Sequence, residues 1–354
     1  MDWTLYPVSE FANWSDQWEQ LNRQAGNNLL LSQSFTRLVL DHFAPAEAKL
    51  AVCSDADQVV AMAVIAPAKQ TGWSTLQPSQ APLGLWIQMP LLDTETLVQR
   101  LLSKLPGLKW VFSITQQDPE LLSRPADSQS LTAMDYIQTA RLSTQGDFDE
   151  YFNQRSKNHR QNLRRQRNRL EREGITPRLE TTTDPEQIAA CIRDYGRLES
   201  SGWKQQLDTA IHSDNIQGKF YSALLAEFMK TNQAAIYRYW YNDDVVAMDL
   251  AICSDGGCDQ ESDKNSTMVI LKTTYDESIN TSSPGVLMHQ EIFQSLFESD
   301  RIQSVEFYGK LMEWHQKWSD DIRTLYHLTY YSWQAHLAKK TMAITRPVRR
   351  LIRL

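Results

Sequence analysis

A short motif with one glycine, TSSPGVLMH at 281–289, joins a polar loop to an apolar stretch with helical spacing. Proline suits the first position of a helix, because its missing N–H would have no partner there. Gly285 lets the backbone approach a ligand without a Cβ in the way. Free amides and the helix dipole attract anions at such an N-terminus. The motif predicts a phosphate-binding site at Ser283, Gly285, Val286 and Leu287, and an ordinary capped helix is the alternative.

Three further side chains are predicted to transfer protons. Asp249 lies in the apolar strand VVAMDLAI, on the face of Ala247 and Ala251, where a carboxylate needs a partner or water. In a cleft it can act as a general base. In VEFYGKLMEWHQKW, His315 is predicted to be a base and Tyr308 an acid. The alternatives are a solvent-facing Asp249 and a buried, fully bonded His315.

The end of the strand STMVILKTTYDE carries two candidate substrate contacts, Tyr275 and Asp276. They are predicted to orient the substrate or to handle a proton. The alternatives are a packed tyrosine ring and an aspartate that caps the next turn. Trp314 is predicted to contact the substrate as well.

A dense basic stretch, RSKNHRQNLRRQRNRLEREG at 155–174, stands in a chain whose net charge is −7. On a helix Leu163 and Leu170 share one side, and the arginines spread around the rest. A solvated amphipathic helix is one interpretation. The other is that a subset, represented by Arg164, binds the phosphates of a cofactor or an anionic acceptor. General nucleic-acid binding is not expected, because the protein is acidic and shows no nucleic-acid module.

The succession of elements predicts a mixed α/β fold. Each half runs helix, helix, hairpin, strand, helix, strand, with hairpins at 48–67 and 234–256. A hairpin followed by a strand–helix–strand crossover gives a mixed sheet flanked by helices. The chain has 354 residues, which favours two domains of about 100–200 residues each. The predicted domains are 1–144 and 145–335, followed by a basic tail at 336–354.

The four cysteines and seven histidines show no pattern typical of a metal site, so no metal is expected. All four cysteines are predicted to be free thiols in a reducing cytoplasm; the alternative is a disulfide or metal site, for which only the pair in CSDGGC has a suitable spacing. The N-terminus lacks a signal-peptide pattern, and no run of about 18 apolar residues occurs.

Three stretches together resemble the CelD/BcsL-type acyltransferases, a branch of the GNAT superfamily linked to exopolysaccharide and cellulose production. They are RSKNHRQNLRRQRNRLEREG, KTTYDESINTSSPGVLMHQEIFQSLF and VEFYGKLMEWHQKW. The resemblance covers about residues 145–335 and extends to the Fem-type aminoacyltransferases. This chain has one glycine in its loop, where ordinary GNAT proteins have a glycine-rich one. It has Trp314 and His315 where the related group tends to have Tyr-Lys.

The resemblance implies two tandem GNAT-like units, with the chemistry in the second. The implied co-substrate is acetyl-CoA or another acyl-CoA. The implied acceptor is an amine or hydroxyl of a sugar, a glycolipid or a cell-envelope or exopolysaccharide precursor, which attacks the thioester directly in a ternary complex. A backbone N–H of the strand before Tyr275 would stabilise the oxyanion. A Fem-like transferase that uses aminoacyl-tRNA, and a catalytically degenerate binding protein of a polysaccharide-synthesis machine, remain open.

The tail, with ITRPVRRLIRL at its end, interleaves aliphatic residues with arginines. This pattern predicts contact with an anionic membrane surface or with a partner, so that the expected cytoplasmic protein would be peripheral at the inner membrane. A disordered basic tail is the alternative.

Overall fold

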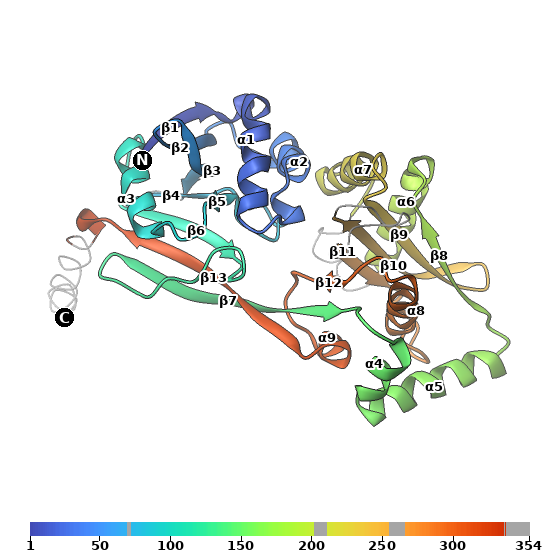
Figure 1. Ribbon diagram of the computed structural model, residues 1–354. Coiled ribbons are helices and arrows are strands. Elements are labelled where there is room, and N and C mark those ends of the chain that lie inside the picture. The colour runs from blue at the N-terminus through green and yellow to red at the C-terminus, as the bar shows by residue number, and fades with distance from the viewer. Residues whose placement is uncertain (69–71, 202–210, 255–265, 336, 338–354) are drawn as a thin grey trace, which may run out of the picture. The chain divides into compact units, whose positions relative to one another are not determined.

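The computed structural model describes residues 1–68, 72–201, 211–254, 266–335 and 337. The chain forms two compact units (Figure 1). Unit 1 contains Met1–Ile137 and Thr324–Leu354, and unit 2 contains Gln138–Arg323. The chain passes between them twice, within strand β7 (Leu131–Ser143) and within strand β13 (Asp321–Tyr331).

Unit 1 is built on the strand order β1-β2-β3-β4-β6-β13, with β5 paired to β3. Its other elements are β1 (Asp2–Pro7), η1 (Val8–Glu10), α1 (Phe11–Gln24), η2 (Leu29–Leu31), α2 (Gln33–Phe43), β2 (Lys49–Asp55), β3 (Gln58–Ala68), β4 (Gly72–Thr75), β5 (Trp86–Gln88), α3 (Thr94–Lys104) and β6 (Val111–Gln117). Most neighbours are antiparallel, and β4 and β6 are parallel.

Unit 2 is built on the strand order β7-β12-β11-β10-β9-β8. Its elements are α4 (Phe148–Gln154), α5 (Lys157–Arg172), β8 (Pro177–Thr182), η3 (Pro185–Gln187), α6 (Ile188–Ser201), α7 (Ile216–Met229), β9 (Ala234–Tyr241), β10 (Asp244–Cys253), β11 (Thr267–Tyr275), α8 (Pro284–Ser299), β12 (Ser304–Glu306) and α9 (Glu313–Trp318). Among the described strand pairs of this unit, only β11 and β12 run parallel. The helix α8 makes the crossover between them.

The two units repeat one topology: a strand, two helices, a hairpin, a strand, a crossover helix and a parallel strand. In each unit the last strand of the crossover pairs with a strand that lies far from it in the sequence. The strand β13 pairs with β6 in unit 1, and the end of β7 pairs with β12 in unit 2. The mixed α/β fold with mixed sheets flanked by helices is therefore confirmed.

The compact units differ from the predicted division in the place of the last strand. The prediction assigned residues 145–335 to one domain, whereas β13 completes the sheet of unit 1. Its side chains Tyr326 and Leu328 are fully buried in the core of unit 1, which explains this pairing physically. The predicted tail at 336–354 lies outside the described residues except for residue 337. In the part of the chain that the structure describes, no helix is long and apolar enough to span a bilayer.

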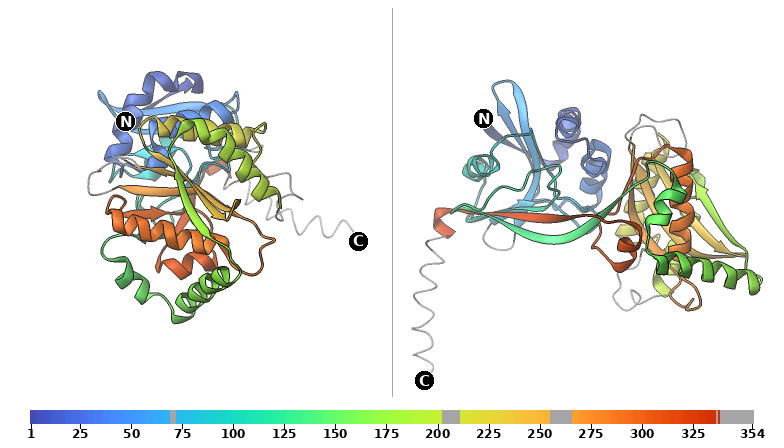
Figure 2. Two further views of the ribbon diagram at one scale, coloured as in Figure 1. Left: turned by 90° about the vertical axis from the view of Figure 1, so that its right-hand side faces the viewer. Right: turned by 60° about the horizontal axis from the view of Figure 1, so that its bottom comes forward.

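Helices cover both faces of the sheet in unit 2. Figures 1 and 2 show α8 on one face and α6 and α7 on the other. Strand residues alternate between the faces, so Ala247 and Ala251 of β10 pack with Leu287, Ile292 and Phe293 of α8. This face is the one on which the functional site forms.

The cysteines depart from the prediction of four free thiols. Cys53 and Cys191 are free and buried. Cys253, the last residue of β10, is disulfide-bonded, so the prediction is wrong for this residue. For Cys253 the structure therefore shows the disulfide that the sequence left as the alternative.

Candidate functional site

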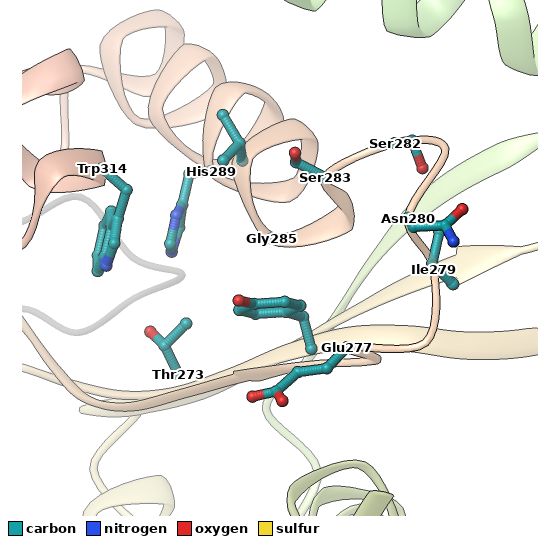
Figure 3. Close-up of a pocket in the computed structure, with 11 residues that line it drawn as sticks. Thr273, Glu277, Ile279, Asn280, Ser282, Ser283, Gly285, His289 and Trp314 are labelled. Atoms are coloured by element: carbon teal, nitrogen blue, oxygen red, sulfur yellow. The ribbon is translucent and has the colours of Figure 1, made fainter. Parts of the chain in front are cut away.

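A cavity of about 630 Å³ opens between the end of β11, the start of α8 and the helix α9 (Figure 3). Its lining consists of Thr273, Tyr275, Glu277, Ile279, Asn280, Ser282, Ser283, Gly285, Val286, His289 and Trp314. All of these residues belong to unit 2. Five of them, including the tryptophan of α9, were predicted from the sequence to bind donor or substrate.

In the first turn of α8, two of the three N–H groups that were predicted to be free already have acceptors. The N–H groups of Val286 and Leu287 both donate to the carbonyl of Ser283, at 3.0 and 3.1 Å. The expectation that they are free is therefore wrong, because Ser283 is the N-cap and its carbonyl accepts the first helical bonds. The Gly285 amide has no acceptor among the described residues. The Ser283 side chain makes no capping bond either, so it remains available to a ligand.

The four predicted phosphate-binding residues separate into two groups. Ser283, Gly285 and Val286 line the cavity. Leu287 does not, and it is fully buried in the core of unit 2. A Cβ placed on Gly285 would lie 3.5 Å from the Tyr275 ring, which is an ordinary contact. The glycine therefore keeps the cavity open beside that ring.

The basic helix α5 holds the loop that precedes α8. Gln166 accepts a 2.6 Å hydrogen bond from the Ser283 amide, and Arg169 donates to the Thr281 carbonyl at 3.4 Å. From the sheet, Tyr241 hydrogen-bonds Ser282 at 2.9 Å. These contacts fix the loop from both sides. Part of the basic stretch therefore has a structural role, which is to hold the loop before α8.

The side of α5 predicted from leucine spacing is confirmed. Its buried residues are His159, Leu163, Gln166 and Leu170. The arginines outside this side have different surroundings: Arg167 pairs with Glu291 of α8 at 3.0 Å, whereas Arg164 is exposed and lines a separate hollow of about 580 Å³. Arg164 therefore does not share the cavity.

A second hollow on α5 adjoins the loop of the cavity. Arg165, Arg169 and Arg172 line it together with Thr281, and its volume is about 770 Å³. Thr281 lies between Asn280 and Ser282, which line the cavity itself. The loop thus has the cavity on one side and a cluster of arginines on the other.

The strand β11 leaves its neighbour before it reaches the cavity. Its ladder with β12 ends at the pair Val269–Glu306, although β11 continues to Tyr275. Beyond Val269, that side of β11 has no strand partner within the described ranges. An irregularity in the β10–β11 register falls at the same level, between Leu250 and Ala251. Backbone groups on this side of β11 therefore have no ladder partner among the described strands beyond Val269.

The two residues at the end of β11 behave differently. Tyr275 is 45% exposed and lines the cavity, as the sequence predicts for a substrate contact. Asp276 does not line it. Its carboxylate accepts bonds from the amide and the hydroxyl of Ser278, at 2.9 and 2.6 Å, and so caps the next turn.

A buried histidine–aspartate pair stands at the wall of the cavity. Asp249 is 0% exposed, and its Oδ2 lies 2.9 Å from Nε2 of His289. The predicted face of Asp249 is confirmed, whereas a solvent-facing position is excluded. Figure 3 shows the His289 ring beside the Trp314 ring above Thr273, and the two rings stack at 4.7 Å and 14°.

Sequence reasoning did not identify His289. Two signals pointed to it: a carboxylate in an apolar strand needs a buried partner, and His289 interrupts the apolar side of α8 four residues after Gly285. Only the packing of α8 on β10 shows that these two residues meet.

Neither Tyr308 nor His315 lines the cavity, although His315 lies against the cavity residue Trp314. Nδ1 of His315 accepts a 2.9 Å bond from the Met312 amide, and its ring stacks on Trp314. Burial, with a contribution from His289, lowers the pKa of His315 to about 4. Tyr308 is buried with a φ of 46°, and the Arg323 guanidinium lies 5.0 Å above its ring. Their catalytic roles stay predictions.

Comparison with known proteins identifies the type of domain that contains the cavity. The model of the acetyltransferase (GNAT) domain matches residues 157–316. These residues form a GNAT acetyltransferase domain. The protein is accordingly a transferase, and its cavity lies within the matched segment. The match is to the general domain, so membership of the CelD/BcsL-type branch stays a prediction. No curated relative matches the chain in sequence.

Solved structures of similar fold cover almost the whole chain. One is the C-terminal domain of a putative lysylphosphatidylglycerol synthetase from Agrobacterium fabrum, with 13% identity, a TM-score of 0.53 and coverage of 94% of this chain and 97% of that one. Another is FemX, with 10% identity, a TM-score of 0.53 and coverage of 94% and 98%. At this identity the likeness concerns the fold alone.

Within the described residues, no group of three or more His, Cys, Asp or Glu could hold a metal ion.

Proposed function

We propose that unit 2 transfers an acyl group from acyl-CoA, with acetyl-CoA as the simplest donor, to an amine or hydroxyl acceptor. The acceptor class is a sugar, a glycolipid, or a cell-envelope or exopolysaccharide precursor. The observation that supports this most is the cavity that joins the start of α8 to the unpaired side of β11. A donor with phosphates at one end and a thioester at the other requires both features.

The phosphates fit the start of α8. The Gly285 amide and the Ser283 hydroxyl are available there, and the helix dipole adds partial positive charge. The arginines of the adjoining hollow, Arg165 and Arg172, lie beyond Thr281 and favour a polyanion at this end of the cavity.

The corresponding helix start in unit 1 suits phosphate poorly. The crossover helix α3 begins at Asp93, whose carboxylate accepts the Thr96 amide at 2.8 Å. A capping carboxylate occupies the amides and repels phosphate. This contrast supports unit 2 as the donor-binding unit.

The thioester fits the exposed side of β11. A backbone N–H beyond Val269 can donate to the oxyanion that forms when the acceptor attacks the thioester carbon. Among the described residues, no cysteine lines the cavity, which favours direct attack over a covalent enzyme intermediate.

The acceptor is proposed from the polar side of the cavity and from the predicted family branch. Glu277, Asn280 and Thr273 provide hydrogen-bonding groups, and Trp314 and Tyr275 provide aromatic surface. The predicted cytoplasmic location and the membrane contact of the tail belong to this proposal.

A second donor is supported by the charges on α5. The exposed residues Arg164, Arg165 and Arg172 would suit a long polyanion, so a Fem-like reaction with aminoacyl-tRNA is the alternative. Turnover that depends on aminoacyl-tRNA and not on acyl-CoA would select it.

Titration of the full chain with CoA, acetyl-CoA, longer acyl-CoAs and tRNA tests the proposal. A donor at 100 times its dissociation constant raises the free energy of unfolding by about 2.7 kcal/mol. We expect this stabilisation with acetyl-CoA, measured by thermal shift and calorimetry. If none of the donors binds, the protein is a degenerate binding protein and the proposed reaction is wrong.

A further inference from the structure

We infer that His289, held by Asp249, carries the proton in the transfer reaction. It takes the proton from the acceptor amine or hydroxyl and delivers it to the departing thiolate. Asp249 acts through His289 as a positioning residue. The inference rests on the proposed function and concerns the same cavity.

The hydrogen bond between the two residues determines where the lone pair of the imidazole lies. An ionised carboxylate only accepts, so Nε2 of His289 donates to Oδ2 of Asp249 over 2.9 Å. In the neutral ring, Nδ1 is then an acceptor. Nδ1 is buried and has no hydrogen-bond partner within the described residues, and the same holds for Oδ1 of Asp249. Buried polar atoms are normally paired. An unpaired acceptor on a residue that lines the cavity points to a proton donor in the bound ligand.

The ring of His289 is held rigidly. It stacks with Trp314 on one side, at 4.7 Å, and with Phe293 at 5.5 Å and 3°. Asp249 stands directly opposite Thr273 in the β10–β11 ladder, and Thr273 also lines the cavity. His289 is therefore part of the cavity wall, one helical turn beyond Gly285, and Asp249 is held beneath it by their hydrogen bond.

The titratable groups around the Asp249–His289 pair come from α6, α9, β10 and the end of β11; on α6, the buried Tyr195 interacts electrostatically with Asp249. Asp249 lies on β10, His315 on α9, and Tyr275 and Glu277 at the end of β11 and in the loop that follows. Of these, Asp249 is directly bonded and fully buried. His315 is a poor proton acceptor, because its Nδ1 already accepts the Met312 amide and burial lowers its pKa.

The proposed step is balanced in atoms and charge. The acceptor nitrogen or oxygen attacks the thioester carbon, a C–N or C–O bond forms, and its proton moves to Nδ1 of His289. The Asp249 carboxylate stabilises the imidazolium without taking the proton. When the tetrahedral intermediate collapses, the C–S bond breaks and the proton passes from Nδ1 to the sulfur. CoA leaves as the thiol, and His289 is neutral again.

Kinetics of the full chain test this inference. The release of CoA thiol from acetyl-CoA is measured against pH, with glucosamine as the acceptor and with water alone, and acetyl-CoA affinity is measured separately. His289→Gln keeps a donor to Asp249 but has no basic nitrogen. We expect kcat to fall by about 10²–10⁴-fold and the rising limb of the pH profile to vanish, with the affinity for acetyl-CoA unchanged.

Asp249→Asn tests the positioning role. It removes the charge that stabilises the imidazolium, so we expect a smaller loss in kcat and a rising limb moved to lower pH. Asp249→Glu restores the carboxylate and should return part of the rate. His42→Gln, in α2 of unit 1, is the matched control and should leave the profile unchanged.

Spectra of the protein labelled with ¹⁵N-histidine give a readout that needs no turnover. The His289 signals, assigned by their loss in the His289→Gln protein, should show the proton on Nε2. A proton on Nδ1 would overturn the inference. So would a His289→Gln protein that binds acetyl-CoA and keeps the wild-type rate and profile, or a rising limb lost only in His315→Gln. If the wild-type protein binds no acyl-CoA, that result would instead contradict the proposed function itself.

Discussion

Gly285 lines the cavity at the start of α8, where it is predicted to contact a ligand. It is buried in the first turn of α8 and does not need a positive φ, so the fold itself does not require glycine there. The atoms nearest to a Cβ at this position belong to Tyr275, whose ring would lie 3.5 Å away, and both residues line the cavity. The absence of a side chain therefore benefits whatever binds beside Tyr275.

Gly285→Ala should change stability and donor binding in opposite directions. Alanine in a helix is favoured over glycine by about 0.5–1 kcal/mol, so the free energy of unfolding should stay the same or rise. The added methyl group narrows the approach of the donor phosphates, so the affinity for acetyl-CoA should fall several-fold. Thermal unfolding and calorimetry measure the two effects. Unchanged affinity in this variant, and in Gly285→Val, would rule out the start of α8 as the phosphate site.

At the scale of elements, α5 combines two functions on different sides. Its buried side carries Gln166, which fixes the loop before α8, while its exposed arginines face two separate hollows. Only the hollow with Arg165 and Arg172 adjoins that loop. The hollow that contains Arg164 lies away from the cavity lining, so the two sets of arginines can be tested against each other.

Charge reversal on α5 should therefore depend on position. Arg165→Glu with Arg172→Glu should weaken acetyl-CoA binding, since removing a charge-assisted hydrogen bond costs about 1.5–3 kcal/mol. The effect should shrink as salt rises. Arg164→Glu, on the other hollow, should leave donor affinity unchanged, and all variants should keep stability within about 0.5 kcal/mol. If both sets of variants bind acetyl-CoA at low salt as tightly as the wild-type protein does, α5 only positions the loop, and its arginines are simply solvated.

At the scale of the whole molecule, the chain completes each sheet with a strand from a distant part of the sequence. The strand β13 pairs with β6 over Val111–Gln117, and β7 pairs with β12 over Arg141–Ser143. Unit 1 consequently depends on residues that lie far along the chain from its own β6. Tyr326, Leu328 and Tyr330 of β13 belong to the buried core of unit 1.

Removal of β13 should unfold unit 1. Truncation after Arg323 deletes the core side chains Tyr326, Leu328 and Tyr330, each worth about 1.5–3 kcal/mol, and exposes the edge of β6. This loss is comparable to the whole stability of a domain, about 5–15 kcal/mol. Truncation after Ala335 retains β13 and should melt like the full chain. Near-ultraviolet circular dichroism on heating distinguishes the two. Identical cooperative transitions in both truncations would contradict the role given to β13.

Local patterns determined much of this protein from the sequence alone. Leucine spacing predicted the buried side of α5, and strand alternation placed Asp249 on the face of Ala247. The Ser-Pro-Gly motif predicted where α8 begins and which loop lines the cavity. These features depend on residues a few positions apart, whose periodicity and backbone preferences are local. The short edge strand β1 and the long strand β7 lacked a clear pattern, and neither was predicted.

Tertiary structure alone decided the features that depend on distant partners. It paired Asp249 with His289, forty residues apart, because α8 packs on β10. In the folded chain the Val286 and Leu287 amides donate to the Ser283 carbonyl, and β13 pairs with β6 in the sheet of unit 1. The buried carboxylate indicated that a partner was needed but not which one. Local preference determines the face that a side chain occupies, whereas its partner follows from long-range packing, to which many distant residues contribute.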